Sequence, residues 1–355
     1  MMGTNPENNQ IAGALTFPNR SQDVRSVPVQ PRQPRSLQGL LRFAMEATKA
    51  EDAPGNSEFS PMDDERRKFL EEALKSLTVN VAEVLQSSIK VLTETEKIRS
   101  IQLGEPLPND VDLAFNNLLE FIDDIDVAND FYKMGGFAVF PICYGSENEE
   151  VRARASSVLA ETCQNNPYCQ SRALECGLLN VLIHLVQSER GNALAKCLYA
   201  ISCVCREFEP AARELLSQGG AAVLATLLRA QEPAARTRVA FLVRHLAHHY
   251  AEAKEQFIQN NVVRIVIEQL RSGRDDTSEH FLGILLALVE GLEPIVLEQA
   301  RDPSLNLKKV LEDHLKHPEL EYSYIEEKEY CQEILRQVFD NCSPIEVLSD
   351  EIADR

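Results

Sequence analysis

Hydrophobic residues recur every three or four positions along most of the chain from residue 62 onward, which is the spacing of one apolar face on an α-helix. The clearest start is "SPMDDERRKFLEEAL", where Ser60 or Asp63 is a potential N-cap. The apolar stripe consists of Phe69, Leu70, Ala73 and Leu74. Helical spacing continues to "GEPLPND" at 104–110, a proline- and glycine-containing break. Aromatic residues make up only 6% of the chain and tryptophan is absent. The pattern predicts an all-α protein.

The two ends of the chain lack this pattern. Residues 1–35 are rich in Asn, Gln, Ser, Pro and Arg, a composition that predicts a disordered segment. Residues 36–61 begin with a short amphipathic stretch, "SLQGLLRFAMEATKA", and end in a polar linker. A frayed C-terminal tail is expected over 346–355.

Four segments of the chain repeat one pattern, with a period of about 42 residues. They begin at Gly136, Gly177, Gly220 and Asn261. Each opens with a residue that tolerates a left-handed helix end, continues with a short apolar helix, a polar turn and a longer helix, and closes with a further helix. One such unit cannot bury its apolar face alone, so neighbours must stack. We therefore expect an armadillo-like helical repeat solenoid with helical caps.

The boundaries follow from these patterns. The armadillo-like domain is expected over 62–345, its repeats over about 107–300, and its caps over 62–105 and 301–345. In the second cap, "EYSYIEEKEYCQEILRQVF", the helical spacing predicts that Ile325, Tyr330, Ile334 and Leu335 pack inward while the glutamates stay in solvent.

Alignment of the longer helices brings cationic or imidazole side chains into one column. The column contains Arg154, Lys196, Arg238 and His280, each 42 residues after the last. On stacked repeats such a column becomes a row along one face. Two interpretations stay open. The row can offer spaced donors to carboxylates of a folded partner, or it can be an ordinary solvated face.

Charge and composition narrow the classes of partner. Acidic residues (55) outnumber Lys and Arg (36), and the net charge of −19 argues against nucleic acid or an anionic membrane as the main partner. No apolar run is long enough for a signal peptide or a membrane span. The nine cysteines form no C-x-x-C pair and mostly lie in apolar helical segments, as expected of buried hydrophobic residues in a reducing compartment. We expect a cytoplasmic protein with access to the nucleus.

The sequence offers little catalytic chemistry. His245 and His249 lie one helical turn apart, as metal ligands can, but H-E-x-x-H is absent and no third ligand stands at a known spacing. There is no P-loop and no G-x-S-x-G elbow. The cysteines lie among Ala, Leu and Ile, where thiols are usually inert. We expect neither an enzyme nor a bound metal or cofactor.

A set of motifs resembles a known family. "LQGLLRFAMEA", "MDDERRKFLEEAL", "DVANDFYKMGG", "AISCVCREFEPA" and "EHFLGILLALV" occur in the order and spacing of the Fes-one family, the armadillo-type nucleotide-exchange factors of the heat shock protein 70 chaperone. The resemblance covers about residues 36–340. It implies a curved core that embraces one lobe of the chaperone's ATPase domain and weakens its hold on ADP. ATP then enters and the client is released, with no catalysis by the factor itself.

The resemblance also implies which residues meet the partner. In a concave groove it points to Ala128, Arg154, Asn165, Lys196, Arg206, Arg238 and His280. We add Asn129 and His245 to the expected groove residues, although the pair His245 and His249 matches no signature of the family. Ala128 would lie in the turn "DVAND", where a small residue lets the partner approach, and Asn165 and Arg206 would lie three turns beyond the row. The family suggests an association with chaperone-linked ubiquitin ligases. We expect a monomer. The alternative is an armadillo scaffold or adaptor without exchange activity.

Overall fold

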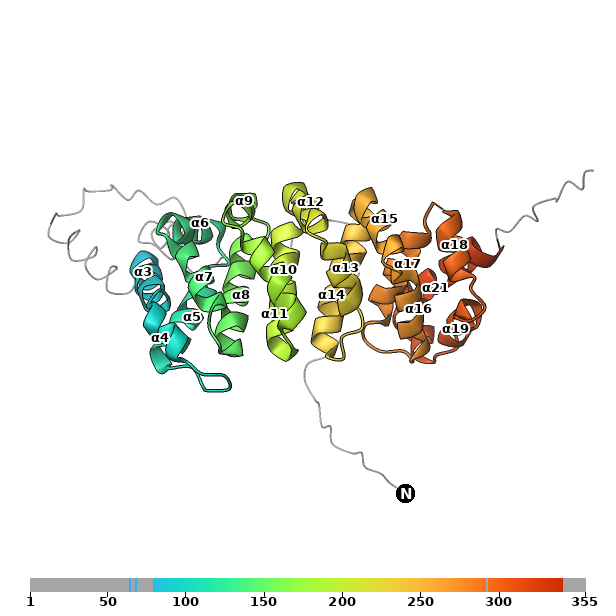
Figure 1. Cartoon of the computed structure of the whole chain (residues 1–355), viewed down its shortest axis with the longest axis horizontal. Coiled ribbons are helices and arrows are strands. Elements are labelled where there is room, and N and C mark those ends of the chain that lie inside the picture. The colour runs from blue at the N-terminus through green and yellow to red at the C-terminus, as the bar shows by residue number, and fades with distance from the viewer. Residues whose placement is uncertain (1–63, 65–67, 69–78, 292, 341–355) are drawn as a thin grey trace, which may run out of the picture. The chain divides into compact units, whose positions relative to one another are not determined.

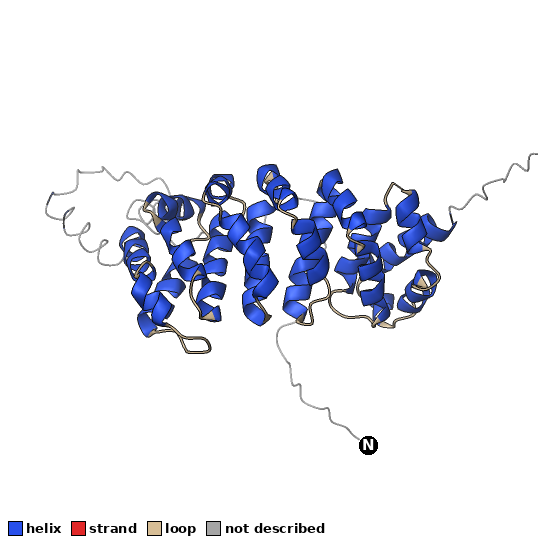
Figure 2. Ribbon diagram, viewed as in Figure 1, coloured by secondary structure: helices blue, strands red, loops and turns tan. Residues whose placement is uncertain are grey.

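The structure is a computed structural model that describes residues 64, 68, 79–291 and 293–340. The chain divides into two compact units, Met1–Val79 and Asn80–Arg355, and nearly all the described residues belong to the second. Every regular element described in that unit is a helix (Figure 2). None of the described helices is both long enough and apolar enough to cross a bilayer. The all-α prediction is confirmed for this part of the chain.

Several predicted segments lie outside the described residues. These are the disordered segment at 1–35, the helix and linker at 36–61, and the tail at 346–355. Most of the N-terminal cap between 62 and 78 is also outside them. The domain boundary at residue 62 therefore remains a prediction.

The described helices follow a cycle of three. Before the first repeat come α3 (Val81–Leu92), α4 (Thr95–Ser100) and α5 (Asn109–Phe121). The first two repeats are α6 (Ile125–Lys133), η1 (Gly136–Ala138) with α7 (Val139–Tyr144), and α8 (Glu149–Cys163), then α9 (Pro167–Glu175), α10 (Leu178–Ser188) and α11 (Gly191–Cys205). The next two are α12 (Glu209–Ser217), α13 (Gly220–Leu227) and α14 (Pro233–His249), then α15 (Ala251–Gln259), α16 (Val262–Arg271) and α17 (Ser278–Val289). The last elements are α18 (Pro294–Ala300), α19 (Leu307–His314), α20 (Glu319–Tyr322), α21 (Ile325–Leu335) and the π-helical turn η2 (Arg336–Asp340).

The turn between the first and second helices of each repeat has a left-handed residue at its centre. These residues are Gly135, Gly177, Gly219 and Asn261, with φ of 83°, 71°, 76° and 59°. Glycine, and to a lesser degree asparagine, adopts this conformation at little steric cost. The predicted helix ends are confirmed, but in the first and third repeats the left-handed residue is the first glycine of the Gly-Gly pair, one position earlier than predicted.

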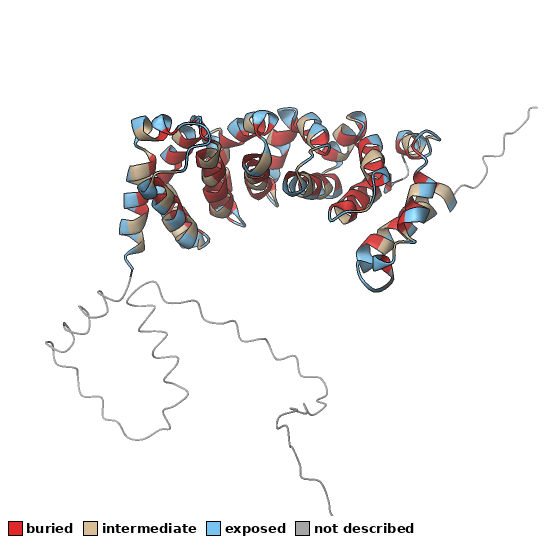
Figure 3. Ribbon diagram, turned by 90° about the horizontal axis from the view of Figure 1, so that it is seen from below, coloured by how far each residue is buried: buried red, intermediate tan, exposed pale blue. Residues whose placement is uncertain are grey.

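The third helices of successive repeats pack against one another in order, from α8 through α11 and α14 to α17. α5 continues this layer before α8, and α21 continues it after α17. Within residues 80–340 the repeats form a bowed row, with the first and second helices on its outer side (Figures 1 and 3). Buried apolar residues from nearly all these helices form one continuous core. We call the surface formed by α5, α8, α11, α14, α17 and α21 the inner face.

In the second and third repeats, the first and second helices pack closely because a large residue on one faces a small residue on the other. A Cβ atom added to Gly220, at the start of α13, would lie 2.5 Å from both the Cδ1 and the carbonyl oxygen of Leu215 on α12. The equivalent positions one repeat earlier hold Leu178 and Ala173, so the large and small residues are exchanged. Both of those side chains are buried. In these two repeats the turn is compact because one of the two positions is small.

The C-terminal cap differs from its prediction at two residues. Ile334 is fully buried as expected, but Ile325 is 66% exposed. Glu327, expected in solvent, is 1% exposed. Its carboxylate accepts hydrogen bonds from the Arg274 guanidinium at 3.0 and 3.1 Å and from Nε2 of His314. A buried carboxylate is tolerable because two partners surround it.

Candidate partner-binding face

The predicted row of Arg154, Lys196, Arg238 and His280 lies on the inner face. Arg154 and Arg238 each contact a residue on the inner-face helix that precedes their own. Arg154 on α8 donates to Asp112 and Asn116 on α5. Arg238 on α14 lies over the ring of Tyr199 on α11, with 4.5 Å between the guanidinium carbon and the ring centroid. The structure thus brings the row together as one continuous surface feature.

The other two row members, His280 and Lys196, also lie beside residues of neighbouring inner-face helices. His280 on α17 meets Phe241 on α14 edge to face, with ring centroids 6.0 Å apart. Lys196 on α11 and Arg154 line one polar pocket of about 390 Å³, together with Ser157 and Asn192. Four helices, α8, α11, α14 and α17, therefore supply one side chain each to the row.

The charges of the row are not equivalent, which corrects the picture of four evenly spaced cations. Arg154 is neutralised within the chain by Asp112 and by Glu150, whose oxygen lies 3.6 Å from its Nε. Burial lowers the pKa of His280, so this imidazole is neutral near pH 7. Only Lys196 and Arg238 remain as positive row members without an ion pair among the described residues.

A third cation of the same kind joins them. Arg206 is the C-cap of α11, and its guanidinium carbon lies 5.6 Å from the centroid of the Phe241 ring. It also has no carboxylate partner among the residues that the structure describes. Lys196, Arg206 and Arg238 thus leave uncompensated positive charge on the middle of the inner face of an acidic protein.

The other arginines of the run "RTRVAFLVRHLAHHY" have structural partners. Arg236 donates to Asp275 and, at 3.1 Å, to the hydroxyl of Thr277 in the next repeat. Arg244 donates to the hydroxyl of Tyr330 at 2.5 Å and lies across Gly283, where a Cβ atom would be 2.6 Å from its Nε. These two side chains fasten α14 to the following helices and are not free for a partner.

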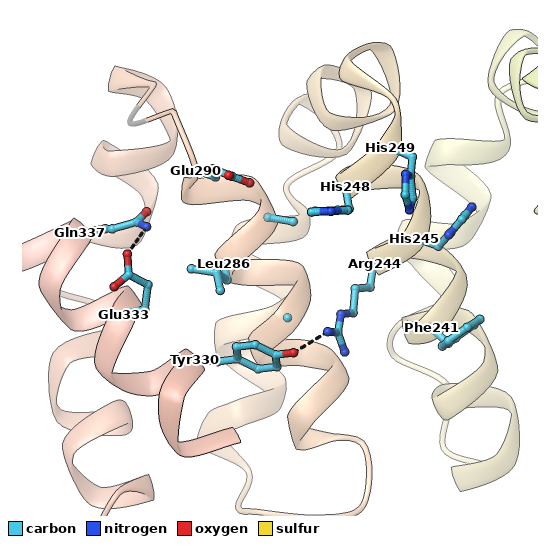
Figure 4. Close-up of a pocket in the computed structure, with 12 residues that line it drawn as sticks. Phe241, Arg244, His245, His248, His249, Leu286, Glu290, Tyr330, Glu333 and Gln337 are labelled. Atoms are coloured by element: carbon cyan, nitrogen blue, oxygen red, sulfur yellow. Dashed lines mark hydrogen bonds between the residues drawn. The ribbon is translucent and has the colours of Figure 1, made fainter. Parts of the chain in front are cut away.

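A pocket of about 580 Å³ opens between α14, α17 and α21 (Figure 4). Its floor is α17, and the Arg244–Tyr330 hydrogen bond spans it from one wall to the other. The α14 wall carries the histidine cluster, which consists of His245, His248 and His249. The rings of His245 and His249 are 4.4 Å apart between centroids.

His245 is held neutral by its surroundings. Burial is the largest of the effects that lower the pKa of this imidazole to about 4, and the neighbouring His249 and Arg206 contribute in the same direction. Its Nε2 is buried and has no hydrogen-bond partner among the described residues. A proton on this ring would therefore meet no acceptor and would lie close to a guanidinium.

Substitution of His245 should reduce the acid sensitivity of the fold. An unfolded histidine has a pKa of about 6.5. The folded value is lower, so the stability that neutral His245 contributes is complete above about pH 6.5 and is lost as the pH falls towards 4. Between pH 7 and 5, His245→Gln should lose about 1 kcal/mol less free energy of unfolding than the wild type, after discounting for the ring's partial exposure. Urea denaturation at both pH values measures this, and equal losses would contradict it.

The position expected to admit a partner closely is not in a turn. Ala128 lies inside α6 and is 1% exposed, so that prediction is wrong. Its carbonyl faces the Sγ of Cys169 at 3.7 Å. The neighbouring Asn129 accepts a hydrogen bond from Asn166 at 3.1 Å. Both residues therefore join α6 to α9, because the spacing of "DVANDFYK" is that of a helix capped by Asp124.

Asn165 and Arg206 also sit slightly differently from their predicted places. They lie beyond the ends of α8 and α11 instead of within these helices. Asn165 is exposed and left-handed, with φ of 52°. Of the two, only Arg206 is shown contacting the inner-face aromatic residue Phe241.

Sequence reasoning missed a second column beside the row. Three residues after each row member stand Ser157, Tyr199, Phe241 and Gly283, again 42 residues apart. The two aromatic residues therefore fall in the central repeats. The alignment that revealed the cationic row contained this column too, but its mixed residue types concealed it.

The described residues offer little chemistry beyond binding. No group of three or more His, Cys, Asp or Glu among them could hold a metal ion. All eight described cysteines are free thiols, and seven of them are buried; Cys176 is exposed, contrary to the expectation of burial. Burial raises the pKa of Cys143 to about 12 and that of Cys197 to about 11, so these thiols stay protonated and unreactive.

Two family profiles match adjoining parts of the chain. The profile of the SIL1/FES1/HPBP1 C-terminal domain matches residues 127–261, and that of the nucleotide exchange factor Fes1 matches residues 37–131. The chain belongs to the SIL1/FES1/HPBP1 family. Among family members, Hsp70-binding protein 1 of Mus musculus is 28% identical over 88% of this chain and 88% of its own length. Hsp70 nucleotide exchange factor FES1 of Eremothecium gossypii is 29% identical over 36% of this chain and 45% of its own.

Solved structures support the fold of this family member. A designed armadillo repeat protein superposes with a TM-score of 0.58 at 14% identity, covering 72% of this chain and 99% of that one. An engineered protein superposes with a TM-score of 0.59 at 18% identity, covering 72% and 96%. The armadillo-like solenoid predicted from the 42-residue period is confirmed.

Proposed function

We propose that this protein is a co-chaperone that binds the ATPase domain of Hsp70 and accelerates the release of ADP. The observation that carries the proposal is the pair of family matches, which together span residues 37–261 and include a nucleotide exchange factor. Relatives along most of the chain are named Hsp70-binding protein 1. The uncompensated cations Lys196, Arg206 and Arg238 support the inner face as the contact surface.

The mechanism is differential binding. A factor that weakens ADP binding a hundredfold is itself bound a hundredfold more weakly by the ADP state, a coupling of about 2.7 kcal/mol. A continuous core through all the repeats makes the inner face stiff enough to favour one arrangement of the partner. Faster ADP loss lets ATP enter, and client release follows. In this mechanism the factor supplies no catalytic group and binds no nucleotide.

The test is a double charge reversal, Lys196→Glu with Arg238→Glu. The variant should keep its helical content and thermal stability, because neither side chain makes an ion pair among the described residues. Its acceleration of fluorescent-ADP release from Hsp70 should fall at least tenfold, since it meets an acidic partner surface with like charge.

The matched control is Arg213→Glu with Lys316→Glu, which changes net charge equally at exposed positions away from the inner face. It should release ADP at the wild-type rate. If the wild type itself leaves ADP release unchanged, the protein is instead an armadillo scaffold or adaptor. Normal acceleration by the Lys196/Arg238 variant would remove these two residues from the contact surface.

The finer assignments belong to the same proposal. The protein acts as a monomer in the cytoplasm with access to the nucleus, and it joins chaperone complexes that include a ubiquitin ligase. It has no nucleic-acid or membrane partner. Sedimentation of the purified chain tests the monomer, fractionation of cells tests the location, and co-precipitation of ligase activity with Hsp70 tests the association with a ligase.

A further inference from the structure

The middle of the inner face carries an exposed aromatic ring. Phe241 on α14 is 37% exposed, although large apolar side chains in this protein are mostly buried in the core. It lies between Arg206, 5.6 Å from its centroid, and the ring of His280, 6.0 Å away. Figure 4 shows its ring at the edge of the pocket on the α14 wall.

Phe241 differs from the residues at the equivalent position of the other repeats in the apolar surface that it exposes. In the same column Ser157 and Gly283 are too small to protrude. Tyr199 is large, but Arg238 covers its ring and its hydroxyl lies 3.1 Å from Glu161 and 2.9 Å from Gln164. Phe241 is thus the member of the column that presents an uncovered apolar edge.

The neighbours hold the Phe241 ring in place without burying it. Arg206 interacts with its face, and His280 meets it edge to face. A ring fixed in this way loses little conformational freedom when a partner covers it, which favours tight binding. Aromatic and arginine side chains at the centre of a contact surface are the residue types that most often dominate binding energy.

The surrounding charge defines the complementary surface. Arg206 lies over the ring of Phe241, Arg238 precedes it by three residues on α14, and both lack carboxylate partners among the described residues. His280 is neutral near pH 7, so it adds no charge to the site. The complementary partner surface is an apolar recess bordered by aspartate or glutamate side chains.

We propose that Phe241 is the central anchor of the inner face and inserts into such an acid-bordered apolar recess on the ATPase domain of Hsp70. This inference rests on the function proposed above and names one side chain at the centre of the contact surface whose loss weakens binding strongly. The cations orient the partner, and the ring holds it.

The experiment measures the Kd of the full chain for the isolated Hsp70 ATPase domain by calorimetry, together with the rate of ADP release. Phe241→Ala should raise the Kd roughly thirtyfold, the effect of a strong central contact. Phe241→Leu keeps apolar volume and should raise it only about threefold. The matched control is Tyr168→Ala on α9, an aromatic residue of equal exposure (38%) away from the inner face, which should change the Kd less than twofold.

The outcomes separate the two proposals. If the wild type binds the ATPase domain without accelerating ADP release, the exchange function fails, while the Kd series still tests the anchor. If the wild type binds and Phe241→Ala binds equally well, the anchor is overturned and the exchange function stands. If the wild type does not bind the domain, both are overturned. Thermal melts of each variant exclude unfolding as the cause, and a graded Phe, Leu, Ala series supports the anchor.

Discussion

Glu327→Ala should lower the free energy of unfolding by about 3–5 kcal/mol, the usual cost of removing one partner from a buried ion pair. Glu327 is 1% exposed and joins Arg274, which precedes α17, to His314 at the end of α19. Burial raises the pKa of this carboxyl, but the hydrogen bonds from His314 and Arg274 outweigh burial and hold the pKa below its usual range. The substitution leaves two cationic or polar groups without their acceptor in the interior.

Hydrogen exchange is the sharper measurement, because repeat proteins can lose their ends separately. Amides of α19 and α21 should lose protection in Glu327→Ala, while those of α8 and α11 keep it. Glu329→Ala on the same helix removes an exposed carboxylate and should change stability by about 0.5 kcal/mol or less. A loss below about 1 kcal/mol for Glu327→Ala would mean that solvent replaces the missing acceptor.

Gly220→Ala should cost roughly 3 kcal/mol, the upper part of the usual range for overpacking. The added methyl group would lie 2.5 Å from the carbonyl oxygen of Leu215, and this backbone atom cannot turn aside as a side chain can. Urea denaturation followed by circular dichroism measures the change.

Gly145→Ala is the matched control for Gly220→Ala. Gly145 follows α7 with a negative φ of −83°, and the new Cβ would lie 3.4 Å from the nearest backbone oxygen. It should alter stability by less than about 1 kcal/mol. If both variants are equally stable, the close contact at Gly220 relaxes by movement of α12.

Most of the fold could be predicted because it is local and repeated. The spacing of apolar residues fixes each helix, and the recurrence of Gly or Asn every 42 residues fixes the turns. The error of one residue at Gly135 and Gly219 arose because both members of each Gly-Gly pair look alike in sequence. Only packing distinguishes them, since the first needs a positive φ and the second needs an absent Cβ.

The candidate site was less predictable because residues far away in the sequence decide whether a charged side chain is neutralised or buried. Arg154 is neutralised by Asp112, 42 positions earlier, and Glu327 is buried because Arg274 lies beside it, 53 positions away. Ala128 looked like part of a turn until its helix was seen. Phe241 was hidden in the hydrophobic run of α14, where an exposed ring and a core ring have the same sequence signature.

The constant interval between Gly135, Gly177, Gly219 and Asn261 makes the array modular. Excising or duplicating one block of that length, cut at these positions, would leave every junction with a residue suited to a left-handed turn. Such a change would shorten or lengthen the binding surface by one repeat, and no turn between helices would need a new sequence. The architecture therefore offers a simple route for tuning how much of a partner the protein can span.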